Sequence, residues 1–374
     1  MNICFVVSDG LTEFNSSNFR CAIPSDALQR AGHKVSIIHV RQWMEQTEAC
    51  RKICSGADII HLQRVLITET HKHIRYWRSL GKAVTCDWDD GYRLIHPTNA
   101  AAKFWLDGKV TVKLQGGIEY DRKLEEHPIE QFKKGLQICT AGITPSEILS
   151  ESWDDTAPTF VVKNYLDEEL YRRAHKQDNS PDILLGWGGS LSHTESFRDS
   201  GIEEALQQIL QERDNVYLLI IGDQRVVEQI PVPMNKVKFM PYVPWWEWQK
   251  VLMRYDIGLA PLAGDYDDRR SSLKVEEYLL AGLPFVASKS PVYKEFWDVS
   301  SGRFVRHGHD VHNYKDRVTD WYESTIDVID NLRHYTTMAN NNIHIGQKYA
   351  VDNNVDVIVA TYQKIIDLER EERI

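Results

Sequence analysis

The sequence predicts an α/β protein made of two doubly wound domains that face a central cleft, followed by C-terminal helices. In the first 165 residues, short apolar runs alternate with amphipathic helical stretches, a pattern typical of a parallel sheet with crossover helices. A second run of the same kind begins at Ile183, and the polar stretch from Arg172 to Pro181 between the two runs is typical of a linker. At about 150 residues per domain, a chain of 374 residues also favours two domains.

Each strand is expected where an apolar run is bounded by polar or turn-forming residues. In the first half, the expected strands span residues 3–7, 35–40, 58–62, 83–87, 138–144 and 160–163, with helices over 22–31, 68–80 and 120–136. In the second half, the strands span 183–187, 216–221, 237–240, 257–261, 284–287 and 303–305, with helices over 202–212, 245–255 and 273–281. Residues 316–373 are expected to be mostly helical. We therefore expect an N-terminal domain over 1–168, a second domain over 169–345, and a helix over 346–374 that packs back toward the first domain.

Composition and charge argue against several classes of protein. With 42% hydrophobic and 26% charged residues, the chain is expected to fold as a globular protein. No window holds 18 consecutive apolar residues, so no membrane span is expected, and the short apolar start without a basic leader is typical of a strand and not of a signal peptide. The net charge of −10 argues against non-specific polyanion binding. Cys50 and Cys54 are the one close pair among six cysteines, without a second pair to complete a zinc site, so reduced thiols and a cytoplasmic location are expected.

Residues 265–288 are the most informative stretch. A loop rich in charged and hydroxyl side chains follows an expected strand and leads into a helix that begins near Ser271 or Ser272. Lys274 and Glu277 lie three residues apart, on one face of this helix. A cation at a helix N-terminus opposes the helix dipole and therefore needs an anionic partner. A bound phosphate can supply this partner, and so can a neighbouring carboxylate on a solvated helix face.

At this point the sequence resembles a known family. The pattern Ser271-x-Leu273-Lys274-x-x-Glu277-Tyr278-x-x-Ala281-Gly282-x-Pro284 is similar to the donor-binding signature of retaining glycosyltransferases of the GT-B fold, family four (group 1). Further similar segments follow in the family's order, at residues 28–35, 161–167, 183–190, 218–223 and 237–243, so the resemblance extends over most of the chain. It implies the GT-B fold and an enzyme that transfers a hexose or pentose from a UDP- or GDP-linked sugar to an acceptor hydroxyl with retention.

The resemblance also implies the residues of the donor site. Glu277 would accept hydrogen bonds from the ribose hydroxyls in a water-accessible cleft, and Lys274 and Arg270 would contact the diphosphate. These cations stabilise the charge that develops on the leaving diphosphate, so no metal and no other cofactor are expected. The other donor-binding candidates stand in the loop after the second domain's first strand and at the start of the helix: Gly188, Gly189, Ser190, His193, Ser271, Ser272 and Leu273.

The chain departs from the family pattern in three places. Arg269 stands where family members often carry a glutamate that holds the sugar, and Asp265, Asp267 or Asp268 can replace this carboxylate. The usual Arg and Lys after the first strand of the second domain are absent, and His193 occupies that loop. Residues 16–20 stand in place of a Gly-Gly pair in the N-terminal loop. The contacts to the transferred sugar and to the acceptor are therefore expected to differ from those of the family.

The sequence Asp87-Trp88-Asp89-Asp90 follows an expected buried strand and so falls at the edge of the cleft. Three interpretations are open: capping of a helix or turn, contact with an acceptor hydroxyl or support of catalysis, and a metal site. The catalytic candidates are Asp89, Asp90, Asp267 and Asp268, and the candidates for acceptor contact near the cleft are Asn18, Arg20 and His96.

A basic and aromatic cluster spans residues 71–78, with Lys72, Arg75 and Arg78 at helical spacing. It is interpreted either as a solvated helix face or as a contact for a phosphate-bearing acceptor such as nucleic acid, or for an anionic membrane surface that the protein touches peripherally. A tryptophan cluster follows Pro244 and is interpreted either as core packing or as a wall of the cleft: Trp245, Trp246 and Trp248.

The sequence therefore predicts a glycosyltransferase whose partners are a nucleotide-sugar donor and an acceptor. The acceptor is expected to be a polysaccharide or lipid-linked glycan, or else a hydroxymethylated base in DNA, as for some viral enzymes of this fold, which would require base flipping. A nucleotide-sugar epimerase and a non-catalytic nucleotide-sugar-binding protein are the alternatives. A nicotinamide-dependent dehydrogenase is disfavoured because neither domain shows Gly-x-Gly-x-x-Gly after its first strand.

Overall fold

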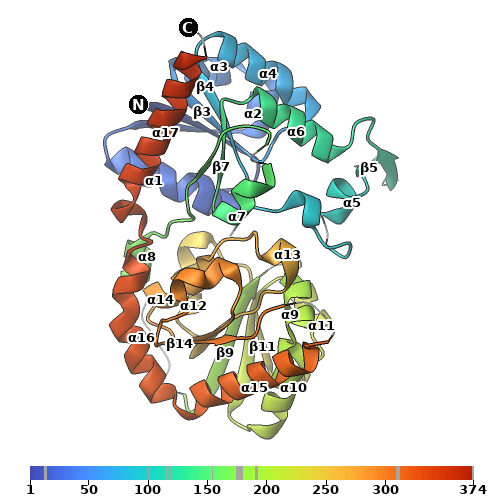
Figure 1. Ribbon diagram of the computed structural model, residues 1–374, viewed down its shortest axis with the longest axis vertical. Coiled ribbons are helices and arrows are strands. Elements are labelled where there is room, and N and C mark those ends of the chain that lie inside the picture. Colours follow the sequence, from blue (N-terminus) through green and yellow to red (C-terminus); the bar gives the residue numbers. More distant parts are fainter. Residues whose placement is uncertain are drawn as a thin grey trace.

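The fold consists of two domains stacked along the long axis of the molecule, each built around a parallel sheet (Figure 1). The computed structural model describes residues 1–11, 15–99, 101–113, 117, 119–153, 155–173, 180–189, 193–308 and 312–372, without the side chain of Arg173. Six strands form each large sheet, in the orders β2-β1-β3-β4-β7-β8 and β11-β10-β9-β12-β13-β14. The predicted fold class is confirmed, because both sheets are parallel and are connected by crossover helices.

The N-terminal domain follows the expected alternation of strands and helices. Its sheet strands are β1 (Asn2–Val7), β2 (Lys34–His39), β3 (Ile59–Gln63), β4 (Ala83–Asp87), β7 (Ala141–Thr144) and β8 (Thr159–Val161). Its helices are η1 (Asn18–Ala22), α1 (Ile23–Arg30), α2 (Val40–Glu45), α3 (Glu48–Gly56), α4 (Thr68–Ser79), η2 (Tyr92–Leu94), α5 (Ala102–Trp105), α6 (Pro128–Ile138), α7 (Glu147–Ser150) and η3 (Glu151–Trp153). The strands form where apolar runs are buried on both faces, so that β3 and β4 are buried at every position.

The second domain repeats this organisation. Its strands are β9 (Ile183–Gly189), β10 (Val216–Gly222), β11 (Val237–Pro241), β12 (Ile257–Ala260), β13 (Phe285–Ser288) and β14 (Gly302–Val305). Its helices are α8 (Glu168–Arg173), α9 (Thr194–Ser200), α10 (Ile202–Glu212), α11 (Gln224–Gln229), η5 (Met234–Lys236), η6 (Trp245–Glu247), α12 (Trp248–Leu252), α13 (Gly264–Asp267), α14 (Leu273–Leu280), η7 (Pro291–Phe296), α15 (Tyr314–Asp330) and α16 (Leu332–Gln347). Helix α14 is the helix that the sequence expects to begin near Ser271 or Ser272.

The chain ends on the N-terminal domain. After η8 (Val351–Asn353), helix α17 (Val355–Glu371) runs up the side of that domain (Figure 1). The Tyr362 hydroxyl and the Nδ1 of His61 are 3.0 Å apart, and Thr140 Oγ1 donates to Glu369 Oε2 over 2.6 Å. The buried face of α17 joins an apolar cluster that continues into the second domain through Tyr165 and Tyr349. The last helix therefore packs against the first domain of the chain.

One part of the secondary structure differs from the sequence prediction. Residues 120–123 were expected to begin a helix, but they lie in β6 (Glu119–Lys123), which pairs antiparallel with β5 (Lys109–Lys113). The helix α6 begins only at Pro128, where His127 Nδ1 accepts a hydrogen bond from the Ile129 backbone N–H, and it continues to Ile138, which the sequence assigned to a strand. The hairpin projects from the domain in Figure 1, and every residue of β6 is exposed. Because neither face of this strand is buried, its sequence shows no alternation of apolar and polar residues.

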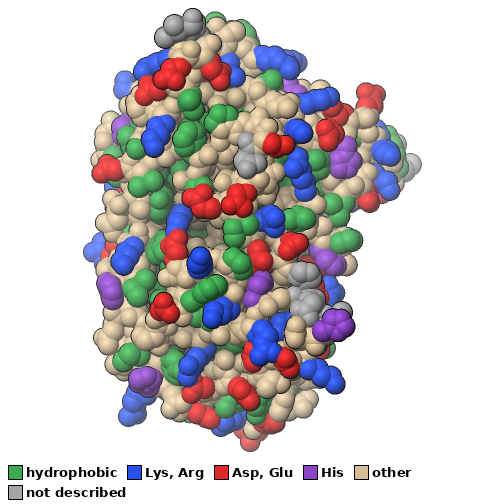
Figure 2. All heavy atoms as spheres, in the orientation of Figure 1, with side chains coloured by type: hydrophobic (Ala, Val, Ile, Leu, Met, Phe, Trp, Pro, Cys, Tyr) green, Lys and Arg blue, Asp and Glu red, His purple; other side chains and the backbone are tan. Residues whose placement is uncertain are grey.

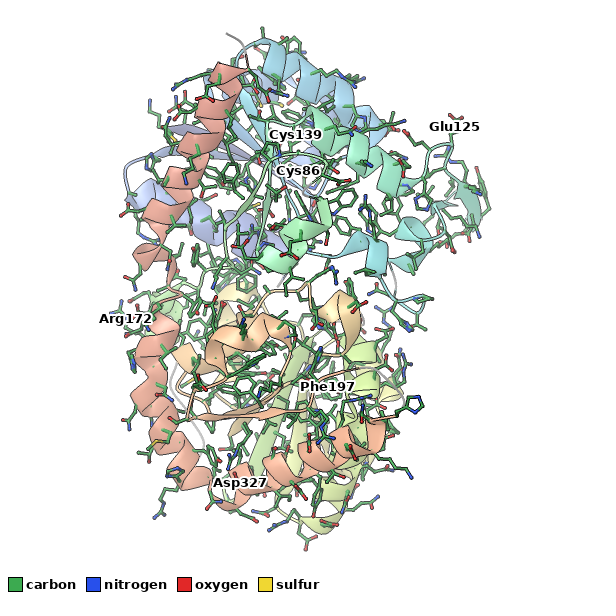
Figure 3. All side chains as sticks on the ribbon, viewed as in Figure 1. Cys86, Glu125, Cys139, Arg172, Phe197 and Asp327 are labelled. Carbon is green, nitrogen blue, oxygen red and sulfur yellow. The ribbon has the colours of Figure 1, made fainter. Side chains whose placement is uncertain are left out.

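Each domain has its own apolar interior. Figure 3 shows Cys86 and Cys139 inside the N-terminal domain and Phe197 inside the second domain. All six cysteines are buried and unpaired. Within the described ranges, no helix has the length and apolar character that crossing a membrane requires.

Candidate functional site

A cavity of about 960 Å³ lies between the two domains, at the carboxyl ends of their strands. We call its two sides the N-terminal wall and the second-domain wall. The N-terminal wall consists of Asn15, Ser16, Phe19, Arg64, Asp89, Asp90 and Asn164. The second-domain wall consists of Gly188, Gly189, His193, Ile221, Tyr242, Val243, Pro244, Trp248, Leu262, Arg270, Ser271, Leu273, Lys274, Glu277 and Tyr293.

Helix α14 brings Lys274 and Glu277 to the second-domain wall. Lys274 Nζ donates to the Gly188 carbonyl over 2.5 Å, and burial lowers the pKa of Lys274 to about 8. Glu277 lines the cavity but is only 3% exposed, so its carboxylate is more deeply buried than the sequence predicts. Its Oε1 accepts hydrogen bonds from Tyr171 Oη over 3.0 Å and from Trp248 Nε1 over 2.8 Å. Among the described residues, none bonds to its second oxygen, so Oε2 is available to a ligand in the cavity.

Burial shifts the pKa values of both Lys274 and Glu277 toward neutral pH. Burial raises the pKa of Glu277 to about 7, against the opposing effects of Lys274 and of the two hydrogen bonds from Tyr171 and Trp248. Because the pKa of Lys274 is about 8, both groups carry their charges together only near neutral pH. A buried lysine beside a buried carboxylate, with a cavity in front of them, can bind an anion and a hydroxyl group at the same time.

Arg270 stands beside Lys274 on the same wall. Its Nε lies 3.0 Å from Asp267 Oδ1, and its guanidinium stacks on Tyr266, with the central carbon 4.6 Å from the ring centre. An Arg270 Nη1 atom also lies 2.7 Å from His193 Nε2. Burial lowers the pKa of His193 well below its usual value, and the nearby Arg270 and Lys274 lower it further. His193 is therefore neutral, and the positive charge of this wall comes from Arg270 and Lys274.

The N-terminal wall carries the opposite charge. Arg64 donates from Nε and Nη2 to the two carboxylate oxygens of Asp89, over 2.8 and 2.9 Å, and from Nη1 to Asp9 over 3.3 Å. Asp90 lies 3.8 Å from the same guanidinium. Burial and then the neighbouring Asp89 raise the pKa of Asp90. One cation thus contacts three carboxylates, of which Asp89 and Asp90 line the cavity, so this wall carries more acidic than basic side chains.

The structure brings together most of the predicted donor-binding residues. Gly188, Gly189, His193, Arg270, Ser271, Leu273, Lys274 and Glu277 all line the cavity. Ser272 is the N-cap residue of α14, but its hydroxyl bonds to Glu276 and not to the helix backbone. Ser190 lies outside the described residues. A side chain on Gly188 would meet the indole of Trp248, with a Cβ only 2.3 Å from its Cη2, so this glycine is also required by packing.

The four catalytic candidates divide between the cavity and the loop behind it. Asp89 and Asp90 line the cavity. Asp267 is 3% exposed and accepts a hydrogen bond from the Ala263 backbone N–H over 2.7 Å. Asp268 Oδ1 accepts from Ser290 Oγ over 2.6 Å and lies 2.9 Å from His307 Nε2. Asp267 and Asp268 thus stabilise the loop that carries Arg270, and we do not include them in the proposed site.

The acceptor candidates lie away from the cavity lining. Asn18 is fully buried, and its Oδ1 accepts from the Asn15 backbone over 2.8 Å. Arg20 is buried in an ion pair with Asp87. His96 lies beside Thr98, with Nδ1 2.9 Å from the Thr98 hydroxyl. These three side chains serve protein contacts, and we do not include them in the proposed site.

The predicted basic face of α4 is not continuous. Arg78 pairs with Glu369, at 2.6 Å, and with Glu372, so it fastens α17 to the N-terminal domain. Lys72 and Arg75 are exposed, and neither has an ion-pair partner among the described residues. The opposite face of the helix, with Ile74 and Trp77, is buried. Arg78 is therefore a structural residue, and Lys72 and Arg75 are the two exposed cations of this cluster.

Sequence reasoning missed Arg64 and left Trp248 undecided. Arg64 directly follows β3, with a left-handed backbone conformation of φ 62° that is unusual for arginine. Its one signal in the sequence is its position after a buried strand, the same signal that singled out Asp89. Trp248, which was interpreted as either core or cleft wall, does both: it is 6% exposed, lines the cavity and donates to Glu277.

Within the described part of the chain, no group of three or more His, Cys, Asp or Glu side chains is arranged to hold a metal ion. This includes Asp87, Asp89 and Asp90. Asp87 points away from the cavity into the buried pair with Arg20, whereas Asp89 is bound to Arg64 through both of its oxygens. The third interpretation of this segment, a metal site, is therefore not supported by the arrangement of its carboxylates.

Comparison with known proteins agrees with this architecture. Residues 185–324 match the family model described as "Glycosyl transferases group 1". HepE of Anabaena, solved in complex with UDP and glucose, has a TM-score of 0.63 and 14% identity, and the match covers 97% of this chain and 100% of HepE. Sucrose-phosphate synthase from Thermosynechococcus elongatus has a TM-score of 0.65 and 12% identity, over 98% of this chain and 99% of that one.

The fold alone does not identify the reaction. A putative UDP-N-acetylglucosamine 2-epimerase from Listeria monocytogenes is also similar, with a TM-score of 0.51 and 12% identity over 98% of this chain and 96% of that one. No curated protein matches the sequence. The chain has the GT-B fold, and residues 185–324 of its second domain carry the sequence pattern of the group 1 glycosyltransferases.

Proposed function

We propose that this protein transfers a sugar from a UDP- or GDP-linked donor to an acceptor hydroxyl, with retention and without a metal ion. The observation that carries the proposal is the convergence of Arg270, Lys274 and the Oε2 of Glu277 on one cavity wall. A nucleoside diphosphate offers the two groups that this wall can bind: a diphosphate for the cations and ribose hydroxyls for the carboxylate.

The donor's leaving group is the diphosphate, whose negative charge grows as the glycosidic bond breaks. Arg270 and Lys274 lie in a largely buried wall, where a fixed positive charge stabilises this developing charge more than it does in water. Retention is supported by the resemblance of residues 271–287 to the signature of retaining enzymes. HepE, with UDP and glucose bound, supports a nucleotide-sugar donor by analogy of fold.

A donor screen tests the function directly. Purified protein is incubated with a panel of UDP- and GDP-sugars, with and without oligosaccharide acceptors, and release of the nucleoside diphosphate is measured. We expect at least one donor to be hydrolysed slowly alone and faster with an acceptor. Lys274→Met is the negative control: it removes the cation without adding bulk, and we expect it to release less nucleoside diphosphate than the wild type. Failure of every donor to bind or react would contradict the proposal.

Turnover is expected to survive a chelator, because protein cations occupy the position in which a metal would neutralise the diphosphate. In 5–10 mM EDTA, roughly a thousandfold above trace metal, we expect the rate to stay within about twofold of the untreated enzyme. Complete loss of activity that magnesium or manganese restores would contradict metal independence and would direct attention to Asp89 and Asp90.

The acidic N-terminal wall favours an uncharged, polyhydroxylated acceptor. Asp89 and Asp90 stand beside a single arginine in this wall, and carboxylates accept hydrogen bonds from sugar hydroxyls but repel phosphates. On the face shown in Figure 2, positive and negative side chains are interspersed, so it presents no broad basic track for a nucleic acid. We therefore favour a glycan over a modified DNA base.

Salt dependence separates these two acceptors. For a glycan, we expect acceptor affinity to change little with ionic strength, and the variant Lys72→Ala/Arg75→Ala to bind as the wild type does, because both cations belong to a solvated helix face. For DNA, the affinity would fall steeply with salt, and the slope would become about two units shallower in this variant. The measurement is acceptor binding between low and physiological salt. Arg78 is left unchanged because it fastens α17.

An epimerase is the second candidate, because Asp89 and Asp90 line the cavity in which a donor sugar would lie. Such an enzyme moves a proton at a sugar carbon, which requires carboxylates near the ring. The donor screen distinguishes the two: epimerisation converts one nucleotide sugar into another without an acceptor, whereas transfer releases the nucleoside diphosphate.

We further propose a cytoplasmic location, since six buried and unpaired cysteines are expected in a reducing compartment.

A further inference from the structure

Two side chains of the second domain reach across to the N-terminal domain beside the cavity. Tyr266, in α13, donates from its hydroxyl to Asp90 Oδ1 over 3.1 Å. Arg269 Nε donates to Ser152 Oγ over 3.2 Å. Asp90 follows β4, and Ser152 lies in η3. Ser146 Oγ also donates to the Arg269 carbonyl over 3.5 Å. Neighbouring residues of one loop thus contact the N-terminal domain at three points.

The Tyr266 side chain also contacts the donor-binding wall. The Arg270 guanidinium stacks on its ring, with the central carbon 4.6 Å from the ring centre. Arg270 in turn lines the cavity and is paired with Asp267. One ring therefore stands between a carboxylate of the N-terminal domain and the arginine that faces the cavity.

The local structure explains why this loop turns toward the N-terminal domain. Arg269 stands where many family members carry a sugar-holding glutamate, but here its side chain packs against Gly91 of the N-terminal domain. A Cβ at Gly91 would lie 3.3 Å from Arg269 Cδ and 3.7 Å from the Tyr266 ring. The absence of a side chain at Gly91 thus lets both residues approach the other domain closely.

We propose that Tyr266 is a positioning residue that couples closure of the two domains to the placement of Arg270 in the donor cavity. Its hydroxyl binds Asp90 only when the domains are together, and its ring then fixes the guanidinium that faces the diphosphate. The coupling rests on the proposed function insofar as it concerns catalysis, but the contact between the domains does not depend on it.

This role predicts a separation between catalysis and donor binding. Lys274 and Glu277 are held by Gly188, Tyr171 and Trp248, and none of these contacts involves Tyr266. Binding of the donor nucleotide by Lys274 and Glu277 is therefore expected to be retained when the Tyr266 hydroxyl is removed. The variant loses the fixed position of Arg270 when the two domains are together, and stabilisation of the departing diphosphate depends on that position.

The test compares Tyr266→Phe with Tyr322→Phe. The first variant keeps the ring under Arg270 and removes the hydrogen bond across the domains. The second removes a solvent-exposed tyrosine-to-carboxylate bond, from Tyr322 to Glu212 over 2.6 Å, within one domain. For Tyr266→Phe we expect kcat to fall roughly tenfold, which is what loss of one hydrogen bond to a charged group brings. The donor Kd is expected to stay within about twofold, and Tyr322→Phe to match the wild type.

Domain closure is measured separately by small-angle X-ray scattering of the unliganded protein. Tyr266→Phe and Ser152→Ala are both expected to increase the radius of gyration, whereas Tyr322→Phe is not. The proposal is overturned if Tyr266→Phe and Tyr322→Phe are alike in kcat and in scattering. It is also overturned if donor affinity falls as much as kcat, because Tyr266 would then be a direct donor contact. If the wild type binds no nucleotide sugar, the proposed function fails, and the scattering comparison still decides whether Tyr266 holds the domains together.

Discussion

Replacing Arg20 by methionine is expected to lower the free energy of unfolding by about 3–5 kcal/mol, because it leaves a buried carboxylate without its partner. The side chains of Arg20 and Asp87 are 2% and 1% exposed, and the guanidinium binds both carboxylate oxygens, the shorter contact being 2.5 Å. Its third nitrogen donates to the Val162 carbonyl over 2.6 Å and to Asn164 Oδ1 over 2.9 Å. The measurement is equilibrium denaturation in urea.

A solvent-exposed ion pair serves as the matched control. Arg30 and Asp352 are 2.7 Å apart, but their side chains are 49% and 60% exposed. Arg30→Met is therefore expected to cost at most about 1 kcal/mol. Equal losses in the two variants would show that the Arg20 pair is not a structural element. If Arg20→Met instead kept its stability and lost acceptor affinity, the sequence-based expectation that Arg20 contacts the acceptor would be supported.

The central strands of the two large sheets could be predicted because they are buried on both faces, whereas edge strands such as β2 and β11 are partly exposed. The runs 3–7 and 218–221 are continuously apolar and buried, which is typical of strands in the middle of a parallel sheet. The hairpin β5–β6 could not be predicted in the same way. Its strands are held by backbone pairing and by exposed ion pairs such as Lys113 with Glu119, which leave no pattern of burial in the sequence.

The second-domain wall could be predicted because Arg270, Lys274 and Glu277 belong to one short segment whose spacing is set by a helix. The N-terminal wall is assembled from residues far apart in the chain. Arg64 has a backbone φ of 62° and donates hydrogen bonds to Asp9 and Asp89, which are 55 and 25 residues away in the chain. The sequence equally does not distinguish a buried arginine such as Arg20 from an exposed one. Arg64 was missed and Arg20 was assigned to the acceptor for the same reason: the partners of both side chains come from distant parts of the chain.

Glu277 is the residue on which the donor site depends most. Trp248 and Tyr171 both donate to its Oε1, which fixes the carboxylate of a residue that lines the cavity. Glutamine keeps an oxygen that can accept both bonds, so Glu277→Gln is expected to fold as the wild type does. The amide places an NH₂ group where two ribose hydroxyls would bind a carboxylate. The variant therefore tests the charge of this group with little change in its shape.

Glu277→Gln is expected to weaken binding of the donor sugar roughly tenfold to a hundredfold, because hydrogen bonds to a charged group are worth about 1.5–3 kcal/mol. Since burial raises the pKa of Glu277 to about 7, wild-type affinity should fall as the pH is lowered through 7 and the carboxylate is protonated, whereas the variant should show no such fall. Toward pH 8, affinity should fall in both proteins, because Lys274, with a pKa of about 8, loses its charge. Glu276→Gln is the control, because Glu276 is a neighbouring carboxylate on the same helix, 1% exposed and bonded to Ser272 behind the cavity. It should retain the affinity of the wild type and its fall below pH 7, while the titration of Glu276 itself, whose pKa burial raises to about 8, is absent. Calorimetric titration between pH 6 and pH 8, roughly one unit on each side of that pKa, measures both effects, and equal losses in the two variants would mean that Glu277 supports the helix and does not bind the donor.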